Sequence, residues 1–219
     1  MLVELLSERT FAERAGVRKR YIASMRQYCT GALAQVRQTY LPQAPSIEDV
    51  LNQRRQSVCV ASLFALVEFG HKIGLPDHVF ETDLLLKVQS LGIDITLLHN
   101  DLLSYYKEEA EEVPHNIIAA CRRRGMGAQE AFTFVGEEVE RRLQDLNKLT
   151  VEIAEGYGPS HGELMRYVQG IKDVIKANLF WSFKSDRFLS GEQKSQLARE
   201  GTLEVLETPR YMSWCNSRF

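Results

Sequence analysis

Long apolar runs are missing from this sequence. A charged residue appears by the fourth position, and no stretch approaches the about 18 apolar residues that a membrane-spanning helix needs. Cysteine is also scarce, and its four copies are scattered without a CxxC pair: Cys29, Cys59, Cys121 and Cys215. That spacing excludes a zinc-finger type of site and a dense disulfide framework. These absences predict a soluble, cytoplasmic protein with reduced thiols.

Neither sign of charge is in excess. Lys and Arg number 27 against 29 Asp and Glu, which gives a net charge of -2. A chain with so little net charge has no bulk attraction for nucleic acid or for an anionic membrane. We therefore expect no nucleic-acid partner, and any basic site has to be local.

Alternating β-branched runs are scarce too, whereas apolar residues recur at helical spacing almost everywhere. The pattern predicts an all-α fold, with one or two helices over about 8–41 and single helices over 47–73, 84–112, 127–155 and 160–183. Ser46 is expected to cap the helix over 47–73 with Asp49. Because no repeat or linker divides the chain, we expect one α-helical domain over 1–190, with 191–219 adding a short helix and a loose tail.

The stretch "HNDLLSYYKEE" places three oxygen-bearing side chains four residues apart: Asn100, Ser104 and Glu108. Four residues turn a helix by about 400°, so the three share one face. Amide, hydroxyl and carboxylate oxygens suit Mg²⁺, which shares its coordination shell readily with phosphate. The alternative is an exposed helix end that carries polar residues by chance.

Three segments together resemble class I terpene synthases in their fungal form. "NDLLSYYKEEAEEVPHN" is similar to the second metal-binding motif of that family, (N/D)Dxx(S/T)xxxE. Residues 45–80 resemble the segment with a double Arg, a helix break and an "LPD" turn, and 167–188 resemble the segment that ends in Trp and an Arg-Tyr pair. The resemblance spans about residues 10–190 and implies the helical bundle of that family.

The resemblance assigns roles to these three oxygen-bearing side chains and to their neighbours. It implies that Asn100, Ser104 and Glu108 hold one Mg²⁺ against the diphosphate of a prenyl substrate. Asp101 lies about 100° round the helix and is expected to support the ligands instead. Lys107 would contact the diphosphate, although an ion pair with Glu111 is the alternative.

Basic and aromatic residues from other segments complete the implied site. Arg55 matches the arginine that senses diphosphate, with the neighbouring Arg54 as the alternative register. Arg187 would clamp the diphosphate, with Phe188 in place of the usual Tyr. Trp181 resembles an aromatic that lines the cavity and stabilises carbocations, with core packing as the alternative.

The helix break implied by the resemblance falls at Val58 and Cys59. A backbone carbonyl at Cys59 would assist ionisation there. The thiol itself has no activating neighbour in the sequence, and a β-branched Val makes unwinding less natural.

The aspartate-rich DDxxD motif of class I enzymes is missing, since Asp49 and Asp77 are isolated. The acidic run "EEAEE" that follows the column is interpreted as a solvated helix end. The chain resembles the C-terminal two-thirds of the family, so we expect a bundle that is incomplete on the N-terminal side. Its central helices would then expose apolar faces, which favours dimerisation, aggregation or an unusual repacking.

The sequence thus predicts Mg²⁺-dependent ionisation and cyclisation of farnesyl diphosphate to a sesquiterpene, with release of diphosphate. The alternative is a truncated or impaired homologue that acts as a diphosphate-binding or helical interaction module. A generic helical scaffold is a third reading, but it leaves Arg55, Lys107 and Arg187 unexplained.

Overall fold

The fold was analysed in a computed structural model that describes residues 15–38, 45–156, 158 and 160–212. All regular structure in these ranges is helical, which confirms the all-α prediction. The elements in chain order are α3 (Ala15–Gln38), α4 (Ile47–Ser57), α5 (Val60–Gly70), η1 (Asp77–Glu81), α6 (Asp83–Ala110), α7 (Ile117–Arg123), α8 (Ala128–Glu155), α9 (His161–Lys184), α10 (Gly191–Glu200) and η2 (Arg210–Met212). None of the helices in the described ranges is both long and apolar enough to cross a membrane.

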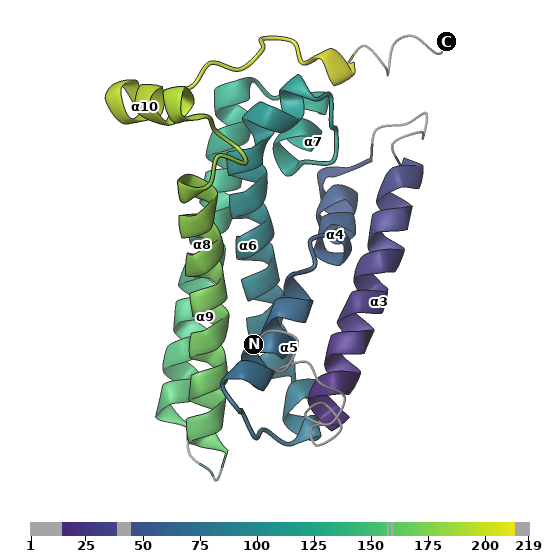
Figure 1. The fold of residues 1–219 in the computed structure, drawn as a ribbon, viewed down its shortest axis with the longest axis vertical. Coiled ribbons are helices and arrows are strands. Elements are labelled where there is room, and N and C mark those ends of the chain that lie inside the picture. The colour runs from purple at the N-terminus through teal and green to yellow at the C-terminus, as the bar shows by residue number, and fades with distance from the viewer. Residues whose placement is uncertain (1–14, 39–44, 157, 159, 213–219) are drawn as a thin grey trace.

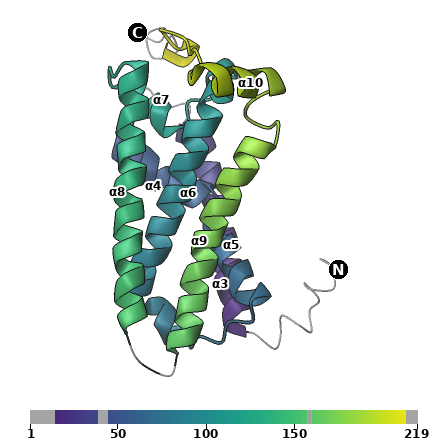
Figure 2. The same cartoon turned by 90° about the vertical axis from the view of Figure 1, so that its left-hand side faces the viewer.

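Helix α6 is the centre of the bundle (Figure 1). Helices α8 and α9 pack on one side of it, while α4 and α5 pack on another and are themselves backed by α3. Helix α10 and the segment after it cross the end of the bundle where α6 finishes (Figure 2). A helix in such a central position can present several faces to different neighbours at once.

Two clusters of buried apolar side chains follow one another along α6. The first contains Val88 and Ile95 and packs against α5, α8 and α9. The second contains Leu97 and Leu98 and packs mainly against α7 and α8. Since packed cores fix the rotation of a helix about its axis, these clusters set the direction of every polar side chain on the C-terminal half of α6.

The predicted helix over 47–73 is divided into α4 and α5, with the break at the predicted place. Ser46 accepts a hydrogen bond from the Asp49 backbone N–H, and the Asp49 side chain completes the capping box. The break occurs at Val58 and Cys59, where Cys59 has φ of 62°, in the left-handed region. That conformation costs a non-glycine residue about 1–2 kcal/mol. Because Cys59 carries the unusual angle, the β-branched Val58 does not prevent the break.

Helix α5 is buried or half-buried except along one side. Leu63 and Leu66 of α5 are 42% and 37% exposed. Within the described ranges, no helix covers that side of α5. The exposure matches the apolar faces expected of an incomplete bundle.

The prediction of a loose C-terminal tail is wrong for the described residues up to 212. Tyr211 is 1% exposed and joins the second core cluster. The "EEAEE" run is also not wholly solvated, because Glu109 is buried against Arg122. Periodicity did not reveal either contact, since both depend on α7, a short helix that the sequence analysis did not anticipate.

Candidate functional site

The predicted oxygen column is held together by donors from two other elements. Asn100, Ser104 and Glu108, here called the first column, follow one face of α6. The Arg54 guanidinium donates through Nη2 to Asn100 Oδ1 at 3.1 Å. Asn116, which caps α7, donates through Nδ2 to Glu108 Oε2 at 2.8 Å and reaches Ser104 Oγ at 3.5 Å. The three oxygens are therefore gathered between α4 and the start of α7.

A second column stands beside the first, one residue on: Asp101, Tyr105 and Glu109. All three side chains are buried. Arg54 binds both carboxylate oxygens of Asp101, and the Ile117 N–H donates to Asp101 Oδ2 at 2.8 Å. This arrangement matches the supporting role expected of Asp101, because it joins the column helix to the elements that carry Arg54 and Asn116.

The lower part of the second column binds the C-terminal segment. Arg122 Nη1 donates to Glu109 Oε1 at 2.9 Å and to the Tyr105 hydroxyl at 3.0 Å. The Tyr105 and Tyr211 hydroxyls are 2.7 Å apart. The Leu206 N–H donates to Glu109 Oε2 at 2.9 Å, and Arg122 Nη2 donates to the carbonyls of Leu206 and Glu207. The segment after α10 is therefore hydrogen-bonded to the second column, which lies on the same helical turns as the first column.

Glu108 supplies the negative charge of the first column. Burial raises the pKa of the Glu108 carboxyl, and the nearby charge of Asp101 raises it further, while the hydrogen bond from Asn116 opposes both. A divalent ion bound to Glu108 would compensate for that burial. The donors are an amide, a hydroxyl and a carboxylate, which is a set of hard oxygens that fits Mg²⁺. Within the described ranges, no three His, Cys, Asp or Glu side chains gather as a metal site.

Arg55 lies apart from the first column. Its Nε and Nη2 donate to the two Asp94 oxygens at 2.6 and 2.7 Å, and Nη1 donates to Asn52. Arg142 of α8 also binds Asp94, at 2.9 Å. Arg54, which was the alternative candidate to Arg55, is instead the arginine that contacts Asn100.

The remaining basic candidates make local contacts in the part of the chain that the structure describes. Lys107 Nζ lies 3.3 Å from Glu111, which is the alternative partner that the sequence suggested. Arg187 is exposed and its guanidinium lies 5.7 Å from the Phe188 ring centre. Trp181 is 48% exposed and meets Phe188 edge to face at 6.0 Å. Trp181 and Phe188 are therefore brought together, while contacts of Lys107 and Arg187 with the first column stay predictions.

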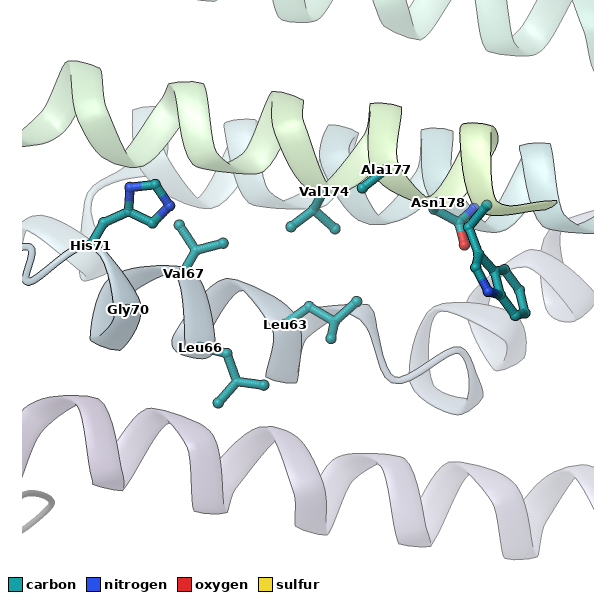
Figure 3. Close-up of a pocket in the computed structure, with 9 residues that line it drawn as sticks. Leu63, Leu66, Val67, Gly70, His71, Val174, Ala177 and Asn178 are labelled. Carbon is teal, nitrogen blue, oxygen red and sulfur yellow. The ribbon is translucent and has the colours of Figure 1, made fainter. Parts of the chain in front are cut away.

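An open apolar groove of about 610 Å³ runs between α5 and α9. Figure 3 shows His71 near one end and Asn178 near the other, with aliphatic side chains between them. The groove is lined by Leu63, Leu66, Val67, Gly70, His71, Val174, Ala177, Asn178 and Trp181. The Cys59 thiol contacts Ser62 and Met25 and does not line the groove. The predicted cavity aromatic, Trp181, is thus part of an apolar surface.

The sequence did not reveal that the Asn116 side chain donates hydrogen bonds to Ser104 and Glu108. It lies in the "HN" pair of the quoted motif, but neither helical spacing nor residue type shows that its amide would turn back onto Glu108. The buried capping bond from the Ile118 N–H to Asn116 Oδ1, at 2.8 Å, fixes that orientation.

Comparison with known proteins agrees with this architecture. Residues 2–145 match the family model described as terpene synthase family 2, C-terminal metal binding. The chain is 32% identical to silphinene synthase of Penicillium patulum over 194 residues, which are 88% of this chain and 52% of that protein. It is 34% identical to cycloaraneosene synthase of Sordaria araneosa over 148 residues, 67% of this chain and 40% of that protein.

The fold is also shared with solved structures. The linalool/nerolidol synthase of Streptomyces clavuligerus, in complex with 2-fluorogeranyl diphosphate, superposes with a TM-score of 0.72 at 19% identity and covers 84% of this chain and 61% of that one. The chain spans about half the length of the relatives it matches in sequence. The family model covers most of the described helices, including all of α6 with both polar columns. The chain therefore belongs to terpene synthase family 2.

Proposed function

We propose that this chain ionises farnesyl diphosphate with the help of Mg²⁺ and cyclises it to a sesquiterpene, releasing diphosphate. The observation that carries this proposal is the first column itself. Its three side-chain oxygens, all hard metal ligands, accept hydrogen bonds from Arg54 and Asn116. The choice of farnesyl diphosphate as substrate comes from the resemblance in sequence.

Asn100, Ser104 and Glu108 would hold the Mg²⁺. The three ligands carry one negative charge between them, so most of the charge of the ion remains available to a bound diphosphate. When bound, Mg²⁺ supplies charge stabilisation to the leaving diphosphate, which is where negative charge develops during ionisation.

We assign the sensing of diphosphate to Arg54 in preference to Arg55. Both arginines are paired with a carboxylate, Arg54 with Asp101 and Arg55 with Asp94, but Arg54 also contacts the proposed ligand Asn100. A guanidinium beside the ligand column can donate to phosphate oxygens in a fixed geometry. Lys107 and Arg187 would add further donors, and the backbone carbonyl at the Cys59 break, which accepts a hydrogen bond from Ser62, would assist ionisation.

The apolar groove would take the hydrocarbon chain of the substrate. Its mostly aliphatic lining offers few groups that could react with a carbocation, and the Trp181 ring offers a π face to it. Because the groove is open, the bound hydrocarbon chain itself would have to displace water from this surface to delay quenching of the cation.

The test is incubation of the purified chain with farnesyl diphosphate and Mg²⁺, with volatile products identified by mass spectrometry. We expect a sesquiterpene, and we expect Glu108→Gln to lower its rate of formation by about 100-fold or more, as removal of one charge-stabilising group does elsewhere. Glu140→Gln on the exposed side of α8 is the matched control. Unchanged turnover in Glu108→Gln would refute the metal assignment.

One observation favours a second candidate, a diphosphate-binding helical module. The groove is open, with Leu63, Leu66 and Trp181 each more than a third exposed. Calorimetric titration with inorganic diphosphate and Mg²⁺ separates the two candidates. Binding that requires Glu108, without product above a boiled control, would favour the module.

A further inference from the structure

Helix α3 is held against the bundle along one side. The Arg20 guanidinium pairs with Glu68 of α5, and the Gln53 side chain of α4 donates to the Gly31 carbonyl. Val17 and Gly31 are buried on the same side of the helix. These contacts fix the rotation of α3 about its axis. The opposite side therefore points away from the bundle, and Figure 1 shows α3 at the edge of the molecule.

The side that points away combines basic and aliphatic residues. Leu33 and Val36 are 63% and 59% exposed there. Residues three or four apart lie on one side of a helix, so the exposed side chains at this spacing form one stripe about 30 Å long. This outer face consists of Arg18, Lys19, Ile22, Arg26, Cys29, Leu33, Val36 and Arg37, all of which are exposed.

Every charged side chain of α3 is basic. The helix carries five Arg and Lys residues and no Asp or Glu. Arg20 is paired with Glu68, whereas the other four, all on the outer face, form no salt bridge within the ranges that the structure describes. An exposed face usually mixes the two signs, as on α8, where Arg141 pairs with Glu138. The outer face of α3 is thus a local basic site on a chain with a net charge of -2.

The combination of charge and aliphatic surface narrows the class of partner. Nucleic acid would match the charges, but contacts to phosphate need no exposed aliphatic side chains. A protein interface is usually centred on an aromatic side chain or a pocket, and the outer face has no aromatic residue. An anionic lipid surface matches both features, because its headgroups attract Lys and Arg and its acyl boundary accepts aliphatic side chains.

We propose that the outer face of α3 binds the surface of a membrane that contains anionic lipids. The helix would lie in the plane of the surface without crossing it, with the four basic groups at the level of the headgroups. Ile22, Leu33 and Val36 would reach the boundary of the acyl chains. Binding through a few charges and three aliphatic side chains is reversible. The proposal does not depend on the proposed function, since it concerns a different surface from the first column.

Cosedimentation with lipid vesicles tests this surface. The probes are vesicles of one part phosphatidylserine to three parts phosphatidylcholine, and vesicles of phosphatidylcholine alone. The intact chain should bind the anionic vesicles at least about 10-fold more tightly than the neutral ones, and high salt should release it because salt screens exposed charges. Equal binding to both vesicles, or no binding to the anionic ones, would overturn the proposal. So would binding to single-stranded RNA without binding to vesicles.

Substitutions on the outer face locate the contact. Arg26→Gln with Arg37→Gln should weaken binding to the anionic vesicles about 25-fold, since each basic residue near such a surface contributes about 5-fold. Leu33→Ser should weaken it about 5-fold through lost apolar contact. Lys148→Gln with Arg199→Gln removes the same charge from exposed positions on α8 and α10. This control should change binding less than about 2-fold. Equal losses in the two double variants would show that net charge drives binding, which would refute the assignment to α3. Circular dichroism of each variant verifies that the helices are intact.

Discussion

Arg122 compensates a buried carboxylate, and its replacement by methionine is expected to destabilise the fold strongly. Arg122 and Glu109 have side chains that are 3% and 4% exposed, and their charged groups are 2.9 Å apart. Removal of one partner of a buried ion pair leaves the other charge uncompensated, which costs about 3–5 kcal/mol. Arg122→Met also deletes the donors to the Leu206 and Glu207 carbonyls.

Thermal unfolding followed by circular dichroism measures this loss. For a chain of 219 residues, 1 kcal/mol shifts the melting temperature by about 2–4 °C, so the variant should melt about 6–20 °C lower. The double variant Arg122→Met with Glu109→Gln removes both charges and should recover part of the loss. A single variant that melts within 2 °C of the intact chain would show that Glu109 and Arg122 do not form a buried pair.

Two further predictions concern packing and titration. Gly92→Ala should destabilise the fold by about 1–3 kcal/mol because its Cβ would meet Ile171 and Phe64, whereas Gly136→Ala, which meets nothing within 4 Å, should stabilise α8 by up to about 1 kcal/mol; urea unfolding of both variants checks this, and equal effects would contradict it. Hydrogen bonds from Arg141 and from Arg142 lower the pKa of the Glu138 carboxyl to about 2, so its contribution to stability is present above the ordinary value of 4.5 and is lost as the pH falls from there to about 2. A carboxyl ¹³C titration should show that midpoint, and one above 4 would refute the paired geometry.

Local patterns predicted the part of this structure that depends on a single helix. The spacing of Asn100, Ser104 and Glu108 placed them on one face, and Ser46 with Asp49 predicted the start of α4. Both conclusions need only the periodicity of a helix and the chemistry of its first turn.

Contacts between elements were beyond those patterns. Which arginine contacts the first column depends on the rotation of α4 about its axis. Burial of Val50 and Gln53 fixes that rotation, and it directs Arg55 toward Asp94. The hydrogen bond that holds Tyr211 is made with Tyr105, which is more than a hundred residues away in the sequence. Neither residue type nor spacing encodes such pairings, since they arise from packing in three dimensions.

The two columns of α6 explain how an open bundle can still hold an ordered candidate site. The first column carries the proposed ligand oxygens, while the second anchors the same helix turns to α4, to α7 and to the C-terminal segment. Because adjacent residues on a helix differ by about 100° in direction, one short segment can carry both a ligand face and a supporting face. Precision at Asn100, Ser104 and Glu108 therefore depends on the buried side of α6, and the exposed groove beside α5 contributes little to it. It follows that changes in the second column should disturb the proposed metal binding more than changes at the open edge of the groove.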